Sequence, residues 1–149
     1  MNKVNSELAS SLERIMEDSH SDFAGLGLID KAARKLRWHT ASGSISGRTL
    51  LVEQKLAAGL SGMAIRSGRP ARSGPVTTDA DVFKLGETVM LGERLRSAAT
   101  LPLEWNGGIH GVLLLGRRTD NAYSPEQIDS AWQAAKLISG AESTALTSG

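Results

Sequence analysis

The sequence contains no cysteine. A chain without thiols has no disulfide, thiolate metal site, cysteine nucleophile or thiol redox centre. It also lacks long apolar runs: stretches such as Val112 to Leu115 are far too short to span a bilayer, and Met1 to Leu12 is too polar for a signal peptide. We therefore expect a cytoplasmic protein with no membrane partner.

The chain has little excess charge of either sign. It carries 17 Lys and Arg against 16 Asp and Glu, and a net charge of +1 provides no strong field for nucleic acid. The three histidines, His20, His39 and His110, show no metal-ligand spacing. We therefore expect no nucleic-acid partner, no metal and no cofactor.

The length and composition predict one folded unit. A chain of 149 residues with 40% hydrophobic and 22% charged residues is typical of one globular domain. We expect a single domain over residues 1–149, with a core over 23–140.

Helices are predicted at both ends of the domain. Near the N-terminus, an apolar stripe predicts a helix over about 6–18, with Asn5 or Ser6 as candidate caps. Near the C-terminus, Ser124, Pro125 and Gln127 form a capping box with proline at the first helical position. Apolar residues then follow on one helical face, at Ile128, Ala131, Trp132, Ala135 and Ile138. The small, polar tail 141–149 is expected to fray.

Strand patterns occupy two stretches between these helices. Residues 23–29 and 35–42 suggest two strands joined near 31–34, although Ala32 and Ala33 equally suit a short helical turn. Residues 95–103 and 109–115 predict a hairpin, because Asn106 and Gly107 are a turn signal.

The middle of the chain is richer in loop residues. Residues 42–48 are expected to form a mobile loop, a short helix to begin near Ser61 and end by Gly68, and residues 71–87 to be irregular. The predicted fold is α/β of the α+β kind. Its antiparallel sheet has the terminal helices on one face and a ligand pocket on the other.

Three segments resemble one known family. The run Gly59-Leu60-Ser61-Gly62-Met63-Ala64-Ile65-Arg66-Ser67-Gly68-Arg69-Pro70 is similar to the short pocket helix of GAF domains. Arg96 to Leu103 with Gly108 to Leu115 resembles the family's strand hairpin, and Tyr123-Ser124-Pro125-Glu126 resembles the start of its last helix. The resemblance covers residues 23–140 and implies a GAF fold.

The resemblance also implies a function. Two kinds of free-standing GAF protein are relevant: free methionine sulfoxide reductases, which depend on cysteines, and nitrate receptors that work with a sensor histidine kinase. In the receptors, the anion lies beside an early-strand tryptophan and main-chain amides of the pocket helix. The matching positions here are Trp38, Leu60, Ser61, Gly62 and Met90. We expect these five residues to bind the ligand.

Independently of the resemblance, the first turn of a helix leaves N–H groups unpaired and carries a partial positive charge, which together attract a small anion. A neutral pocket suits nitrate better than phosphate, although Arg66 and Arg69 leave phosphate as an alternative ligand. The alternatives are a module for an organic metabolite or nucleotide and, third, an enzyme without cysteine. No nucleophile with an adjacent base is evident, so no catalytic residue is expected. The expected partners are nitrate, a sensor histidine kinase and, in a homodimer, a second copy.

Overall fold

A six-stranded antiparallel sheet forms the middle layer of the computed structural model, which describes the backbone of residues 3–148 and the side chains of 7–137. The strands lie in the order β3-β2-β1-β6-β5-β4. Their bounds are β1 Phe23–Asp30, β2 Lys35–Ser42, β3 Glu53–Lys55, β4 Ala71–Arg72, β5 Ser97–Trp105 and β6 Gly108–Arg117.

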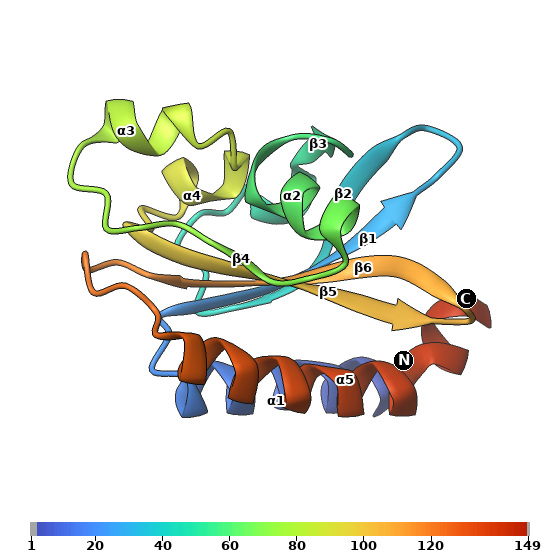
Figure 1. Ribbon diagram of the computed structural model, residues 1–149. Coiled ribbons are helices and arrows are strands. Elements are labelled where there is room, and N and C mark those ends of the chain that lie inside the picture. The colour runs from blue at the N-terminus through green and yellow to red at the C-terminus, as the bar shows by residue number, and fades with distance from the viewer. Residues whose placement is uncertain (1–2, 149) are drawn as a thin grey trace.

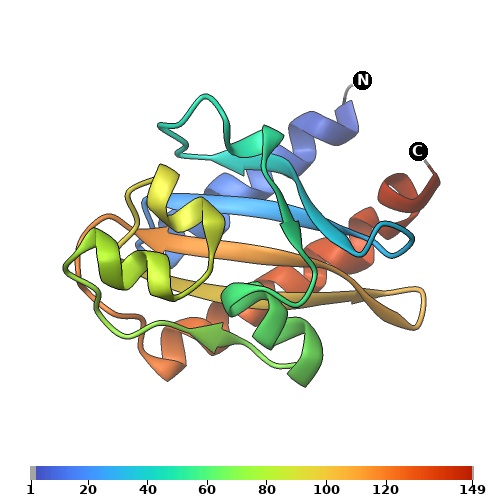
Figure 2. The same cartoon turned by 90° about the horizontal axis from the view of Figure 1, so that it is seen from above.

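Helices cover both faces of this sheet. The long helices α1 (Lys3–Asp18) and α5 (Pro125–Ser148) lie side by side on one face (Figure 1). The opposite face carries the short elements η1 (Thr49–Leu51), α2 (Gly59–Ser67), α3 (Asp79–Lys84) and α4 (Thr88–Gly92), as Figure 2 shows from above. The predicted antiparallel sheet with the terminal helices on one face is therefore confirmed.

Tight turns build both strand hairpins. Between β5 and β6, Asn106 and Gly107 have φ values of 50° and 80°, and two consecutive positive φ angles suit a tight hairpin turn. Between β1 and β2, the Ala33 amide donates to Asp30 Oδ1 at 3.1 Å, and Arg34 adopts a φ of 57°. This second connection is a turn between paired strands, so the hairpin interpretation of residues 31–34 is correct.

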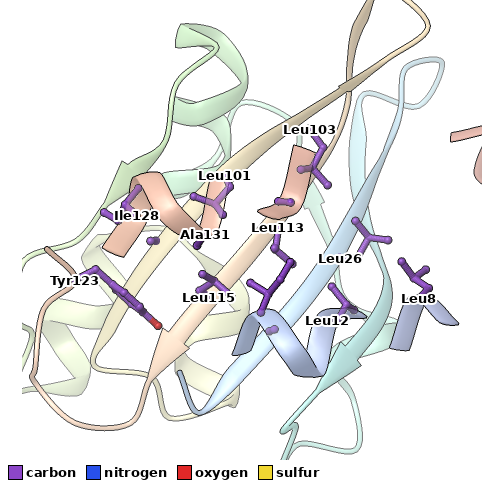
Figure 3. Packing of buried hydrophobic residues seen from close by; sticks show 14 of the residues in the cluster. Leu8, Leu12, Leu26, Leu101, Leu103, Leu113, Leu115, Tyr123, Ile128 and Ala131 are labelled. Atoms are coloured by element: carbon purple, nitrogen blue, oxygen red, sulfur yellow. The ribbon is translucent and has the colours of Figure 1, made fainter. Parts of the chain in front are cut away.

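The helical layer buries a core against the sheet (Figure 3). Leu8, Leu12 and Ile15 of α1 pack with sheet residues such as Leu26, Leu101 and Leu113. The predicted capping box is present, since the Ser124 amide donates to Gln127 Oε1 at 2.9 Å and the Gln127 amide donates to Ser124 Oγ at 3.1 Å. These paired bonds fix where α5 begins.

The ends of both long helices differ from the sequence prediction. Helix α1 begins at Lys3, so Asn5 and Ser6 lie inside it and the prediction that either caps it was wrong. Helix α5 continues to Ser148, so its backbone stays helical beyond Gly140, into the tail that was expected to fray. A glycine inside a helix costs only about 1 kcal/mol relative to alanine, and Gly140 therefore does not end it. The Ile138 side chain lies outside the described residues.

The short elements also differ in detail. Helix α2 begins at Gly59, two residues before Ser61. The region 71–87, expected to be irregular, contains β4 and α3, and α4 follows directly. Helices of five and six residues carry too little hydrophobic periodicity to be recognised from sequence.

A buried tyrosine links the start of the sheet to the start of α5. Tyr123 is 1% exposed, and its hydroxyl is hydrogen-bonded to Ser21 Oγ at 2.6 Å. The Arg117 guanidinium lies 4.0 Å from the ring centroid and donates to the carbonyls of Ser19 and His20 just beyond α1. Burial is the main cause that raises the pKa of Tyr123 to about 12.

This pKa predicts a loss of stability at high pH. Below pH 10 the tyrosine is neutral in both states. Between pH 10 and about 12 it ionises in the unfolded chain but stays neutral in the folded one, so the free energy of unfolding should fall by roughly 2–3 kcal/mol. Urea titrations of the wild type and Tyr123→Phe across this range measure the difference. If the free energy of unfolding falls equally with pH in the two proteins, the assignment to Tyr123 is contradicted.

Trp132 provides a second test of the helical layer. Its indole N–H donates to the Pro102 carbonyl at 2.9 Å, joining α5 to β5. Trp132→Phe should lose about 1 kcal/mol of unfolding free energy, and Trp132→Glu roughly 2–3 kcal/mol because it places a charge against the sheet. Chemical denaturation measures both changes. An unchanged midpoint for Trp132→Glu would show that the residue does not hold α5 on the sheet.

Candidate functional site

Four of the five predicted site residues gather on the sheet face opposite α1 and α5. Trp38 of β2, Leu60 of α2 and Met90 of α4 belong to one buried core cluster, with exposed fractions of 3%, 4% and 0%. Ser61, the third residue of α2, is also fully buried. Strand β2 and helices α2 and α4 therefore bring together four of the residues that were expected to bind the ligand.

The centre of this group is a residue that the sequence analysis missed. The Glu87 carboxylate, 2% exposed, accepts the Ser61 backbone N–H on Oε1 at 2.8 Å. Its Oε2 atom is hydrogen-bonded to Ser61 Oγ and to Gln54 Nε2, both at 2.9 Å. Gln54 Oε1 in turn accepts the Trp38 indole N–H at 3.3 Å. A chain of hydrogen bonds thus runs from Trp38 through Gln54 and Glu87 to α2.

Glu87 caps α2 from a distance. The N-cap residue Ala58 has no side chain able to accept a hydrogen bond, so the first turn has no local cap. The Glu87 carboxylate supplies the missing acceptor from 26 positions further along the chain, and the positive end of the helix dipole favours its charge. The acceptor for the first turn of α2 is therefore Glu87, and Ser61 donates its backbone N–H to it.

Burial and hydrogen bonding act on Glu87 in opposite directions. Desolvation is the larger influence and raises the pKa of Glu87 above its ordinary 4.5, while the hydrogen bonds from Ser61 and Gln54 act to lower it. Backbone N–H and side-chain NH₂ groups only donate, and each carboxylate oxygen faces one of them. The arrangement is therefore built to receive an oxyanion, although burial makes holding one costly.

Two glycines shape the start of α2 in different ways. Gly59 has a φ of 66°, and an ideal Cβ there would lie 2.6 Å from Glu87 Oε1, so only glycine lets the carboxylate come this close. At Gly62, an ideal Cβ would lie 2.3 Å from the Ala57 carbonyl oxygen. Gly62 is the fifth predicted site residue, and the side of it that lacks a Cβ packs against the Ala57 backbone.

A second buried carboxylate lies at the other end of α4. Glu93 accepts hydrogen bonds from the Ser44 and Thr49 hydroxyls, from the Ile45 amide at 2.8 Å and from Arg118 Nη2 at 3.0 Å. Burial acts to raise the pKa of Glu93, but these hydrogen bonds outweigh it and hold the pKa below 4.5. Glu93 is thus a firmly held anion that anchors the loop before η1, which was expected to be mobile.

Glu87 also borders open space. A cavity of about 350 Å³ lies beside it, and the lining residues are Val82, Phe83, Gly86, Glu87, Thr88 and Leu91. Phe83 and Leu91 are exposed at 75% and 42%, so this cavity opens between α3 and α4 at the surface. Glu87 therefore places its carboxylate against the start of α2 and also borders the cavity.

Two kinds of site are absent from the described residues, a metal-binding cluster and a membrane-spanning helix. Across the part of the chain that the structure covers, no three His, Asp or Glu side chains cluster closely enough to hold a metal ion. Among the same residues, no helix combines the length and apolar character needed to cross a membrane.

Comparisons with solved structures identify the fold. An NreA protein from Staphylococcus aureus, mutated in its nitrate binding site, is 23% identical, with a TM-score of 0.65 over 80% of this chain and 88% of that one. A type II free methionine-R-sulfoxide reductase from Thermoplasma acidophilum is 16% identical, with a TM-score of 0.71 over 92% and 90% of the chains.

A third solved structure is a domain of a putative two-component sensor histidine kinase from Sinorhizobium meliloti. It is 17% identical, with a TM-score of 0.72 over 99% of this chain and 97% of that one. No curated protein matches the chain by sequence. The family model described as "GAF domain" matches residues 3–141, nearly the whole chain. The protein is therefore a member of the GAF domain family.

Proposed function

We propose that this GAF domain is a sensor that binds a small planar monoanion, with nitrate as the best candidate, at the start of α2. The observation that carries the proposal is that the hydrogen-bond donors at the start of α2 already hold one planar group with two oxygen atoms, the Glu87 carboxyl group. The Ser61 amide and hydroxyl and the Gln54 side chain are the donors, and Trp38, Leu60 and Met90 supply the apolar walls.

The chemistry of the donors favours nitrate over more highly charged anions. Nitrate, like a carboxylate, is flat, carries one delocalised negative charge and presents oxygen atoms in a plane. The groups that hold Glu87 are neutral, and sulfate or phosphate would cost more to desolvate without a cationic partner. Chloride has no second acceptor atom, so it would leave part of the donor set unpaired.

The comparisons support the same direction. The NreA structure has a described nitrate binding site and shares this fold, which makes nitrate the first ligand to test. The kinase domain with this fold supports a role in signalling, and we propose that ligand occupancy is relayed to a sensor histidine kinase. Binding without catalysis, a homodimer and a cytoplasmic location remain predictions of the sequence.

A second candidate is an organic ligand. The cavity of about 350 Å³ between α3 and α4 is lined largely by apolar residues, with Glu87 among them. Cavities of this size hold small organic molecules. Tight binding of such a metabolite, without nitrate binding, would favour this candidate.

Calorimetric titration of the purified chain tests the proposal. Nitrate at millimolar concentration should bind measurably, and sulfate, phosphate and chloride should bind more weakly. Trp38→Phe should weaken nitrate binding roughly fivefold, because it removes the N–H that orients Gln54 at a cost of about 1 kcal/mol.

Trp105→Phe is the matched control, since Trp105 belongs to the core cluster under the helices on the other sheet face. Its nitrate affinity should equal that of the wild type. Equal weakening by both substitutions, or the absence of nitrate binding by the wild type, would refute the assignment of this site.

A further inference from the structure

The donors proposed for the ligand are already occupied in this structure. The Ser61 amide donates to Glu87 Oε1, and Glu87 Oε2 is bonded to the Ser61 hydroxyl and to Gln54. A second acceptor cannot use the same donors at the same time, because the Ser61 N–H and O–H each already donate to Glu87. A ligand anion and the Glu87 carboxylate are therefore mutually exclusive.

We propose that Glu87 is a built-in competitor that determines the affinity and selectivity of the α2 site, so that an anion binds only when the Glu87 side chain leaves it. This inference rests on the proposed function. It adds a residue that sets the apparent affinity for the ligand. That affinity is proportional to the fraction of molecules in which Glu87 has left the site.

The structure provides a route for Glu87 to leave. Glu87 is one of the residues that line the cavity between α3 and α4, so open space lies next to this residue. Burial raises the pKa of Glu87, because the ionised form loses its hydration in the buried position. Moving the side chain toward the open space recovers hydration and offsets part of the lost hydrogen bonding.

Glu93 fixes the other end of the same helix. It is the C-cap residue of α4, and its carboxylate is held by Ser44, Ile45, Thr49 and Arg118. Arg118 Nε also donates to the Glu93 carbonyl at 2.9 Å. Release of Glu87 would therefore free the N-terminal end of α4 while its C-terminal end stays in place, which changes the α3–α4 surface that carries Phe83 and Leu91.

The test is to remove the competitor. Glu87→Ala deletes the carboxylate and leaves a void next to the Ser61 amide. We expect nitrate to bind at least tenfold more tightly than to the wild type, measured by calorimetry. Formate and acetate, which resemble the deleted group, should raise the melting temperature of Glu87→Ala above that in equal chloride, but not that of the wild type.

Two further variants serve as controls. Glu104→Ala removes an exposed carboxylate on β5 and should match the wild type in both measurements. Glu87→Gln keeps the side-chain volume, so it should show little stabilisation by formate or acetate. If Glu87→Ala does not fold, hydrogen exchange on the wild type replaces it. Nitrate should speed exchange of the Met90 amide, which donates to the Glu87 carbonyl at 3.0 Å, and leave the Glu93-anchored loop unchanged.

The outcomes separate this inference from the proposed function. Nitrate binding to the wild type with equal or weaker binding to Glu87→Ala would overturn the competitor role and leave the proposed function standing. Binding to Glu87→Ala but not to the wild type would support the competitor and refute nitrate sensing by the natural chain. Binding to neither protein would overturn both proposals. Unchanged exchange of the Met90 amide in nitrate-saturated wild type would overturn the competitor role alone.

Discussion

The hydrogen bonds between the Glu87 carboxylate and the start of α2 hold together the face of the sheet that carries the site. Through them α4 contacts α2, and through Gln54 the same carboxylate is linked to β3 and to Trp38 on β2. Helix α2 has no cap of its own, so its first turn depends on an acceptor from elsewhere in the chain. One buried carboxyl group thus links four elements of the fold.

Helix α4 is only five residues long, yet both of its capping residues are buried glutamates. A helix this short is not stable by itself, and its place is set by contacts at its ends. Glu93 binds the loop before η1 and Arg118, and Glu87 binds α2. Burial raises the pKa of Glu87, whereas hydrogen bonds hold the pKa of Glu93 below its ordinary value against the effect of burial.

The features that sequence reasoning predicted have partners close together in the chain. Ser124 and Gln127 are three positions apart, and Asn106 and Gly107 are adjacent, so residue type alone indicates the structure. Trp38, Leu60, Ser61 and Met90 were grouped through family resemblance, and the structure brings them together. Glu87 was missed because its partner Ser61 lies 26 positions away and nothing in the local sequence marks a buried acid. The ends of α1 and α5 were misplaced because weak propensities decide helix ends that lack a strong stop signal.

An internal carboxylate solves a problem that any buried anion receptor faces. When the ligand is absent, the amides at the start of the pocket helix would be buried without acceptors, and each such group costs about 1–3 kcal/mol. Glu87 satisfies them, so the ligand-free domain keeps its donors paired. Under the proposed function, the ligand must replace bonds already made, so its affinity would be lower. Such a ligand would be released when its concentration falls, and the return of Glu87 would restore the first state of α4.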